Sequence, residues 1–382
     1  MNPLLTLNSL GQSVWYDNIQ RSMLSSGMLQ KLVEHDGLAG VTSNPSIFEK
    51  AINGSADYDQ ALAALHGSRP DASHRELFFA LALEDIQAAA DILAPVYRAS
   101  NGKDGMISLE VGPDLANDAD GTIAEARELW QRVGRPNLMI KVPATREGLV
   151  AIRQLIADGI NVNVTLLFST RRHEEVMEAY LKGLEARLRA GKPVDKIASV
   201  ASFFVSRVDS AIDKLLDDIK ANGDEAARKT AFNLLGKIAI ANAKIAYQNY
   251  KQVFGGDRFH QLREAGAQTQ RLLWASTGTK NPQYSDVLYV ETLIGPDTVN
   301  TLPPATFDAF RSHGNAHLTL EHSVDLAHHQ LQMLAELGIK LEAVTDRLEY
   351  EGVAIFADSF NALLKAISDK LGSQRFKGAA SA

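Results

Sequence analysis

Short apolar runs alternate along the chain with longer stretches of helical periodicity. The runs are rich in Val, Ile, Leu and Phe and show little alternation of polar with apolar positions, as expected for parallel strands covered by helices. The pattern therefore indicates an α/β protein. Eight runs are expected to form strands: SVWYDN (13–18), AGVTSN (39–44), MISLEV (106–111), LMIKVP (138–143), NVNVTLLF (161–168), IASVASFFV (197–205), RLLWAS (271–276) and VLYVETL (287–293).

The segments between these runs carry signals that begin and end helices. Residues 122–134 open with Thr122 and Glu125 at the spacing of a capping box, and residues 145–159 open with Thr145 as a candidate N-cap. Further helical segments are expected at 170–191, in inserts near 56–98 and 206–250, and in a C-terminal helical segment at 305–370.

Eight strands that alternate with helices predict a (β/α)8 TIM barrel, here with helical inserts and a C-terminal helical extension. We expect a single barrel domain over residues 1–382. A doubly wound open sheet is the competing architecture. No expected strand is followed by G-x-G-x-x-G or G-x-x-x-x-G-K-[ST], so the usual phosphate-cradling signatures of that architecture are missing.

Composition narrows the classes of function. The 382 residues are 45% hydrophobic, which is ample for a large core. The net charge is −7 and no block of Lys and Arg occurs, so nucleic acid and anionic membranes are not expected as partners. The chain has no cysteine, which excludes disulfides, thiolate metal sites and a cysteine nucleophile.

The amino-terminal stretch MNPLLTLNSLGQS has neither a basic region nor a long apolar core, so a signal peptide is not expected. No apolar run approaches the roughly 18 residues that a membrane span needs. We therefore expect a soluble cytoplasmic protein, while its oligomeric state is not readable from the sequence.

Polar residues recur near the carboxyl ends of the expected strands, where a TIM barrel carries its active site. Any one of them alone would more often be a hydrogen-bonded structural residue. Their occurrence in one register on seven strands favours a site. The residues are Asp17, Asn44, Glu110, Lys141, Asn163, Thr165, Ser202, Arg207 (just beyond its strand) and Ser276.

Lys141 lies within the apolar run LMIKVP, which is an unusual place for an ammonium group. It could extend its stem to solvent or pair with Glu110. It could also be a Schiff-base nucleophile, which must be neutral to attack a carbonyl. An ordinary lysine has a pKa of about 10.4, and burial can lower the pKa of a lysine by several units.

Schiff-base chemistry also needs groups that carry protons. Water must leave the carbinolamine, and a C–C bond of a sugar breaks only if a hydroxyl loses its proton. Asp17 and Glu110 are the two carboxylates at the expected strand ends, and no histidine lies among them. A salt bridge from either carboxylate to Lys141 or Arg207 is the structural alternative, and it is compatible with a catalytic role.

Six segments, in order, resemble the transaldolase family, and its longer bacterial branch in particular. The likeness spans about residues 10–370. The resemblance implies a class I barrel without cofactor or metal that moves a dihydroxyacetone unit between sugar phosphates. The segments are GVTSNPSIF (40–48), ISLEV (107–111), MIKVPAT (139–145), INVNVTLLFS (160–169), SFFVSRVD (202–209) and WASTGTKNPQYSD (274–286).

The reaction implied by the resemblance converts sedoheptulose 7-phosphate and glyceraldehyde 3-phosphate into erythrose 4-phosphate and fructose 6-phosphate. The resemblance makes Lys141 the Schiff-base lysine and Asp17 the base that takes the C4 hydroxyl proton. Glu110, through a water also held by Thr165, would carry protons during imine formation and hydrolysis.

The resemblance also implies residues that bind substrate. Asn44 and Asn163 would bind hydroxyls of the three-carbon unit, and Ser202 its C1 end. Arg207 and Ser276 would hold the phosphate.

One departure affects the phosphate site. Many members carry Ser-x-Arg at the seventh strand, where this chain has Ser276-Thr277-Gly278. A cation returns two residues later, and we expect Lys280 to replace the arginine.

Two positions separate this chain from the related fructose-6-phosphate aldolases, which are much shorter. Those enzymes place glutamine and tyrosine where this chain has Glu110 and Phe204, so both residues are of the transferase type. Phe204 could equally be an ordinary core residue. The alternatives are an aldolase-like lyase and a non-catalytic barrel that binds phosphosugars, which would not need Lys141, Asp17 and Glu110 together.

The stretch HGNAHLTLEHSVDLAHHQ (313–330) holds five of the ten histidines and suggests a metal enzyme as another alternative. His313 and His317 are four residues apart, and Glu321, Asp325 and His329 could share a helical face. The stretch lies away from the expected strand ends, so we expect an exposed helix and no metal.

Overall fold

The computed structural model describes residues 2–379, with side chains to residue 372. Its eight strands are all parallel and close into a barrel in sequence order, β8 pairing with β1. The closed (β/α)8 barrel expected from the sequence is therefore confirmed. The strands are β1 (Gln12–Tyr16), β2 (Gly40–Thr42), β3 (Met106–Glu110), β4 (Leu138–Pro143), β5 (Val162–Leu167), β6 (Ser199–Phe204), β7 (Gln270–Ala275) and β8 (Thr298–Leu302).

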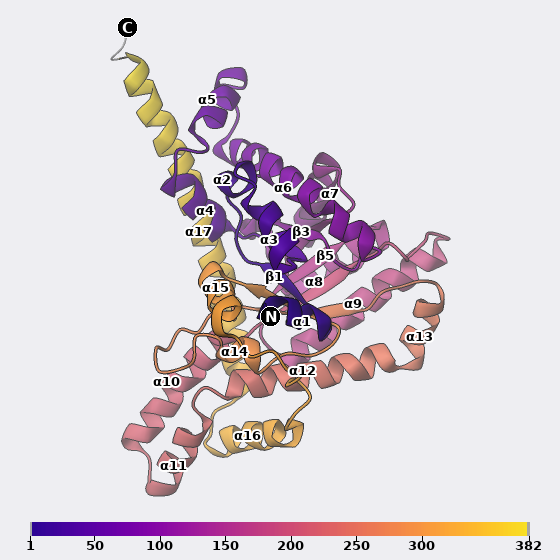
Figure 1. Ribbon diagram of the computed structural model, residues 1–382, viewed down its shortest axis with the longest axis vertical. Coiled ribbons are helices and arrows are strands. Elements are labelled where there is room, and N and C mark those ends of the chain that lie inside the picture. Colours follow the sequence, from indigo (N-terminus) through magenta and orange to yellow (C-terminus); the bar gives the residue numbers. More distant parts are fainter. Residues whose placement is uncertain (1, 380–382) are drawn as a thin grey trace.

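Helices surround this barrel and extend beyond it (Figure 1). A short 3-10 turn, η1 (Pro113–Leu115), follows β3. None of the helices among the described residues is both long and apolar enough to cross a membrane. The helices are α1 (Pro3–Ser9), α2 (Arg21–Ser25), α3 (Met28–Asp36), α4 (Pro45–Gly54), α5 (Asp59–Ser68), α6 (His74–Ala99), α7 (Ala119–Val133), α8 (Arg146–Asp158), α9 (Thr170–Arg189), α10 (Ser206–Asn222), α11 (Glu225–Leu234), α12 (Ile238–Gly255), α13 (Asp257–Glu264), α14 (Leu288–Glu291), α15 (Pro304–His313), α16 (Val324–Glu336) and α17 (Leu341–Ala379).

The prediction of the eighth strand was wrong. Residues 287–293 contain the helical turn α14, and the strand is β8, TVNTL, further along the chain. A short apolar run does not distinguish a strand from a buried helical turn, and Tyr289 and Val290 are buried on that turn. The true strand was hidden because Thr298 and Asn300 are polar although fully buried.

The capping box predicted at Thr122 was also wrong. Helix α7 begins three residues earlier, where Asp118 accepts a hydrogen bond from the Gly121 amide at 3.0 Å. The Thr122 hydroxyl donates instead to the Leu115 carbonyl. The N-cap prediction at Thr145 is confirmed, since its Oγ1 accepts from the Gly148 amide at 3.0 Å. Such caps are worth about 1 kcal/mol each.

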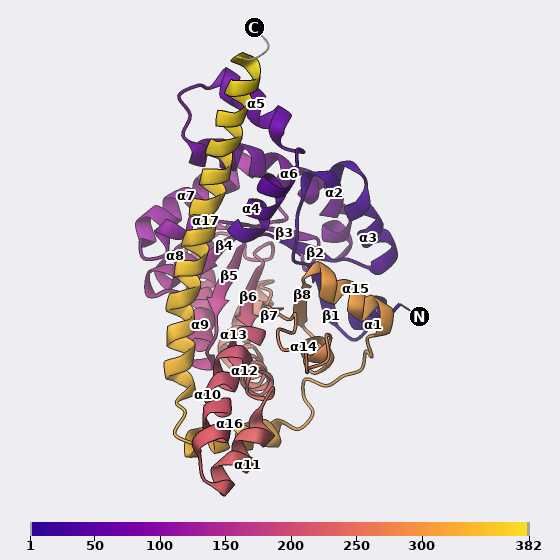
Figure 2. The ribbon, with the colours of Figure 1, turned by 90° about the vertical axis from the view of Figure 1, so that its left-hand side faces the viewer.

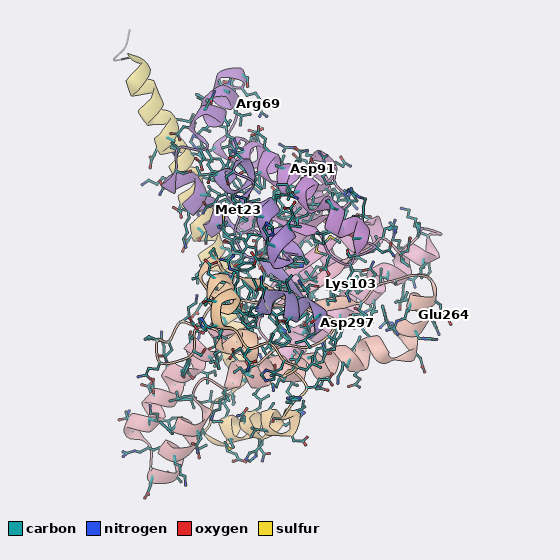
Figure 3. The ribbon with its side chains drawn as sticks, in the orientation of Figure 1. Met23, Arg69, Asp91, Lys103, Glu264 and Asp297 are labelled. Atoms are coloured by element: carbon teal, nitrogen blue, oxygen red, sulfur yellow. The ribbon has the colours of Figure 1, made fainter. Side chains whose placement is uncertain are left out.

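The amino end of the barrel is closed by a paired charge. Arg271, the second residue of β7, is 5% exposed. Its guanidinium donates to Ser13 Oγ at 2.8 Å, to the Lys103 carbonyl and to Asp104 Oδ1 at 2.9 Å. On the surface beside it, Lys103 forms an ion pair with Asp297 at 2.8 Å, and Figure 3 labels both residues there. Buried charge at this end therefore has fixed partners.

Helix α17 runs along most of the length of the molecule and passes in front of the barrel (Figure 2). It contacts α4, α10 and η1, which start directly after β2, β6 and β3, and it also contacts β5. It therefore crosses the carboxyl end of the barrel. Along this helix, Phe356, Phe360, Leu363 and Ile367 are buried at helical spacing and hold the crossing in place.

Candidate active site

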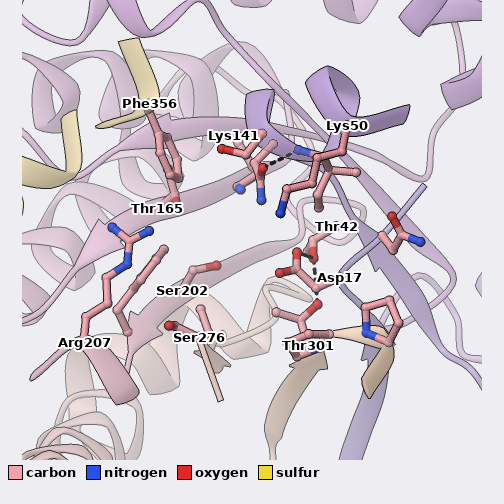
Figure 4. Close-up of a pocket in the computed structure, with 18 of the residues that line it drawn as sticks. Asp17, Thr42, Lys50, Lys141, Thr165, Ser202, Arg207, Ser276, Thr301 and Phe356 are labelled. Atoms are coloured by element: carbon pink, nitrogen blue, oxygen red, sulfur yellow. Dashed lines mark hydrogen bonds between the residues drawn. The ribbon is translucent and has the colours of Figure 1, made fainter. Parts of the chain in front are cut away.

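A cavity of about 530 Å³ opens at the carboxyl end of the barrel, beneath α17 (Figure 4). Most of the site residues expected from the sequence line it: Asp17, Asn44, Lys141, Thr165, Ser202, Phe204, Arg207, Ser276 and Lys280. Glu110 and Asn163 are buried beside the cavity and do not line it. The strand ends therefore bring nine of the eleven expected residues to one space.

Lys141 and Glu110 face each other on adjacent strands. They are register partners on β4 and β3, and Lys141 Nζ lies 3.3 Å from Glu110 Oε2. Nζ also donates to the Ser43 carbonyl at 3.0 Å. Burial raises the pKa of Glu110 above its ordinary value, against the lowering effect of the Lys141 ammonium. A buried carboxyl of raised pKa beside an amine can exchange a proton with it.

Asp17 follows β1 and is held by a threonine pair. Its Oδ1 accepts from the Thr42 hydroxyl at 2.6 Å, and Thr42 is in turn 2.7 Å from the hydroxyl of Thr301. Burial raises the pKa of Asp17, while the Thr42 hydrogen bond and the charges of Lys141 and Lys280 lower it. Asp17 therefore presents a fixed carboxyl on the wall of the cavity, opposite Arg207 (Figure 4).

The amides have defined hydrogen bonds. Asn163 accepts from Ser202 Oγ at 2.6 Å and donates to Ser108 Oγ at 2.9 Å, so it orients the serine that lines the cavity. Asn44 is the N-cap of α4, where its Oδ1 accepts from the Ile47 amide at 3.0 Å. The Asn44 Nδ2 group has no hydrogen-bond partner among the described residues, and it remains available as a donor.

Two buried oxygens near the lysine lack a hydrogen-bond partner. Thr165 Oγ1 and Glu110 Oε2 make no hydrogen bond within the described part of the chain, although Glu110 is at ion-pair distance from Lys141. Burying such groups costs free energy unless another molecule satisfies them. Both oxygens are therefore suited to hold a ligand or a solvent molecule.

Three cations at the cavity have no ion-pair partner among the described residues: Lys50, Arg207 and Lys280. Arg207 is half-buried at the start of α10, with its guanidinium carbon 5.4 Å from the centre of the Phe204 ring. Burial lowers the pKa of Arg207, which marks the cost of holding this charge without a counter-ion. An anion in the cavity would offset that cost.

The backbone is strained at two positions on the rim. Leu166, at a bulge of β5, has φ of 58°, and Ser276, directly after β7, has φ of 54°. Left-handed conformations at non-glycine residues cost of order 1–3 kcal/mol and gather at functional sites. The Ser276 hydroxyl lies 2.9 Å from that of Ser206, the first residue of α10, next to Arg207.

The loop after β7 is tied to α10 by two tyrosines. Tyr289 donates to Asp209 at 2.9 Å and Tyr284 donates to Asp213 at 2.8 Å. Burial raises the pKa of Asp209 to about 7. These bonds fix the loop that carries Lys280 relative to the helix that carries Arg207.

A family model described as Transaldolase/Fructose-6-phosphate aldolase matches residues 14–367 of this chain. The chain belongs to this family. Among curated proteins, the transaldolase of Trichodesmium erythraeum is 47% identical over 373 residues, which cover 97% of this chain and 98% of that protein. The transaldolase of Thiobacillus denitrificans is also 47% identical, over 96% of this chain and the whole of that protein. Transaldolase 2 of Nostoc punctiforme is equally similar, at 47% over 380 residues.

The position where many members of the transaldolase/fructose-6-phosphate aldolase family carry an arginine is a glycine here, Gly278. A side-chain carbon added at Gly278 would meet Thr306 Oγ1 at 3.1 Å and Lys280 Nζ at 3.9 Å. The Lys280 side chain therefore turns back over the glycine. Its ammonium lies beside the backbone from which the arginine would start.

Sequence reasoning missed several residues that line the cavity, among them Lys50 and Phe356. Lys50 lies on α4, two residues beyond the segment GVTSNPSIF, and a basic residue so close to Asn44 was an available signal. Phe356 comes from α17, and only the tertiary crossing of that helix places it over Lys141.

The histidine-rich stretch lies elsewhere. His313 ends α15 and contacts Asp286, with Nε2 2.9 Å from Oδ1. Across the described residues, no group of three or more His, Cys, Asp or Glu side chains is placed to hold a metal ion.

Proposed function

We propose that this protein is a transaldolase that moves a dihydroxyacetone unit from a ketose phosphate to an aldose phosphate through a Schiff base on Lys141. The observation that carries the proposal is a buried lysine, 3.3 Å from Glu110, in a cavity that also holds Asp17 and unpaired cations. The names of the relatives, all transaldolases, support it.

The first stage forms the imine. Neutral Lys141 Nζ attacks the ketose C2 carbonyl, and Glu110 moves protons so that the carbinolamine loses water. The unpaired oxygens of Glu110 and Thr165 support a water molecule between them as the carrier of these protons.

The second stage breaks and remakes a carbon–carbon bond. Asp17 takes the proton of the C4 hydroxyl, the C3–C4 bond breaks, and its electron pair flows into the iminium to leave an enamine on Lys141. The aldose leaves, and a second aldehyde accepts the enamine carbon in the reverse of these steps. Hydrolysis of the new imine then returns the free amine and releases the product ketose.

The remaining residues bind the substrate. Asn44 and Ser202 offer donors to the three-carbon unit, and Asn163 acts on that unit by holding Ser202. Arg207, Ser276 and Lys280 hold the phosphate, whose dianion needs charge-assisted partners. Lys280 takes the part of the missing arginine, as its position over Gly278 supports.

Phe204 and Glu110 favour transfer over simple aldol cleavage. Phe204 lines the cavity and presents no hydroxyl to it, and its ring packs 5.1 Å from that of Phe168. We therefore expect transfer to an aldehyde acceptor to be much faster than release of free dihydroxyacetone. Comparable rates would favour an aldolase-like lyase.

The test is reduction with borohydride in the presence of fructose 6-phosphate, followed by peptide mass mapping. We expect a reduced three-carbon unit on Lys141. Lys141→Ala should abolish the label because it removes the amine. Lys141→Arg should also abolish it, because a guanidinium stays protonated and cannot attack. A label on another lysine would overturn the mechanism, and none at all would leave a barrel that binds phosphosugars without catalysis.

A further inference from the structure

Phe356 is an aromatic residue whose ring faces the proposed catalytic amine. Its ring centre lies 5.9 Å from Lys141 Nζ, and the residue is only 5% exposed although it lines the cavity. Figure 4 shows the ring on the same side of the cavity as Lys141 and Thr165. Phe356 belongs to α17, which contributes no strand or loop to the barrel.

The helix is fastened on both sides of this residue. Before it, Glu349 pairs with Arg172 at 3.1 Å, and Gly352 packs so closely that an added side-chain carbon would lie 3.0 Å from Leu166. After it, Ser359 accepts a hydrogen bond from Ser46 at 2.7 Å. The ring is therefore held in place over the amine by contacts with β5, α9 and α4.

We propose that Phe356 decides the fate of the covalent intermediate by keeping water from the carbon bound to Lys141 Nζ. The inference rests on the proposed function. Once the aldose has left, the enamine can take up a new aldehyde. It can also be protonated on carbon, after which water adds to C2 and the C2–N bond breaks, releasing dihydroxyacetone. A transferase must suppress the second route until an acceptor arrives.

The ring has two properties that suit this role. It covers one side of the amine with apolar surface, which offers no hydrogen-bond partner to a further water molecule beside the one held by Glu110 and Thr165. Its π face also attracts a nearby cation, so it stabilises the positive charge of the protonated imine on Lys141. We assign the exclusion of water to the apolar surface of the ring. Comparing Phe356→Ala with Phe356→Leu tests this assignment.

The measured quantity is the partition ratio, the rate of free dihydroxyacetone release divided by the rate of transfer to erythrose 4-phosphate, with fructose 6-phosphate as donor. Phe356→Ala should raise this ratio by roughly tenfold, because it opens the apolar surface beside the amine to water. Phe356→Leu keeps apolar bulk without a ring and should stay within about threefold of wild type. An unchanged ratio in Phe356→Ala, or an equal rise in both variants, would overturn the inference.

Leu363→Ala is the matched control. Leu363 is fully buried on the same helix, about two turns beyond Phe356, and does not line the cavity. The variant should lower the thermal midpoint and leave the partition ratio unchanged. A rise equal to that of Phe356→Ala would assign the effect to a loosened helix and contradict the role of the ring. Borohydride labelling of wild type separates the two hypotheses. Absence of the label refutes the Schiff base and the inference with it, whereas a label on Lys141 together with an unchanged partition ratio in Phe356→Ala refutes only the role of Phe356.

Discussion

The two ends of the barrel each hold an arginine, one with a carboxylate partner and one without. At the amino end, Arg271 donates to Ser13, to the Lys103 carbonyl and to Asp104. At the carboxyl end, Arg207 has no ion pair among the described residues and leans on an aromatic ring instead. One charge has its counter-ion within the protein, and the other is left for a ligand.

The same difference holds for other groups at the carboxyl end. Thr165 and Glu110 have unpaired oxygens there, and Leu166 and Ser276 have strained backbones. Each of these features costs folding free energy, and a bound sugar phosphate would offset part of that cost. Substitutions at the two ends should therefore separate activity from stability.

The largest effect on activity, short of removing Lys141, is expected at Glu110. Glu110→Gln keeps the size of the side chain but cannot carry a proton, so kcat should fall by roughly 10²- to 10⁴-fold. Steady-state kinetics of the transfer reaction would measure this loss. Because Glu110 also lies 3.3 Å from the buried Lys141 ammonium, the free energy of unfolding is measured beside kcat. An unchanged kcat would contradict the role of Glu110 as proton carrier.

Arg271→Ala should produce the largest loss of stability. It leaves the partly buried Asp104 carboxylate without its ion-pair partner, although Ser13 and Trp15 still donate to it, so the cost should lie at or below the roughly 3–5 kcal/mol of a broken buried pair. Chemical denaturation would measure the free energy of unfolding. The fraction that remains folded should transfer with nearly unchanged selectivity for phosphorylated donors. A selective loss for phosphorylated donors would break the contrast between the two ends.

Arg207→Ala and Lys280→Ala should show the reverse pattern. Each should lower kcat/KM for fructose 6-phosphate by roughly 1.5–3 kcal/mol, the range for hydrogen bonds to charged groups, and change the free energy of unfolding little. Unphosphorylated fructose is the control substrate and should be almost unaffected. Equal losses with both sugars would assign Lys280 to the structure of its loop, and no loss would make it a solvated surface residue.

Stability should also depend on pH, through Asp209. Its pKa is about 7 in the folded protein and 3.8 ordinarily. Between these values the unfolded chain releases the proton and the folded protein keeps it, so the stabilisation is complete below about pH 4 and declines until about pH 7. The slope is at most about 1.4 kcal/mol per pH unit. Denaturation of wild type and Asp209→Asn across this range should show their difference shrinking as pH rises, and parallel curves would contradict the shift.

Much of the fold and site could be predicted because the local patterns were strong. Apolar runs such as LMIKVP indicate their strands clearly. Polar residues at the carboxyl ends of barrel strands gather at one face of the barrel, so their common location could be predicted. The prediction of the eighth strand failed because the buried residues Thr298 and Asn300 of β8 are polar, while the turn at Tyr289 looks like a strand. In a run of only about five residues, the pattern of polar and apolar positions does not distinguish a strand from a buried helical turn.

The missing parts of the site depend on contacts between distant segments. Phe356 follows Lys141 by more than half the chain, and nothing local in α17 says which of its buried aromatic residues faces the amine. Asn163 was expected on the cavity wall, but its partners Ser108 and Ser202 place it behind that wall. Such assignments depend on how the helices pack, which single-chain periodicity does not encode.

The crossing of α17 has a consequence for synthesis on the ribosome. Strand β8 ends at Leu302, and the last of the expected site residues is Lys280, so the barrel strands and Lys141 precede α17 in the chain. A nascent or truncated chain that stopped there would carry an amine open to any small carbonyl compound in the cell. Once α17 is complete and packed, it covers Lys141 and limits which carbonyl compounds can reach the amine.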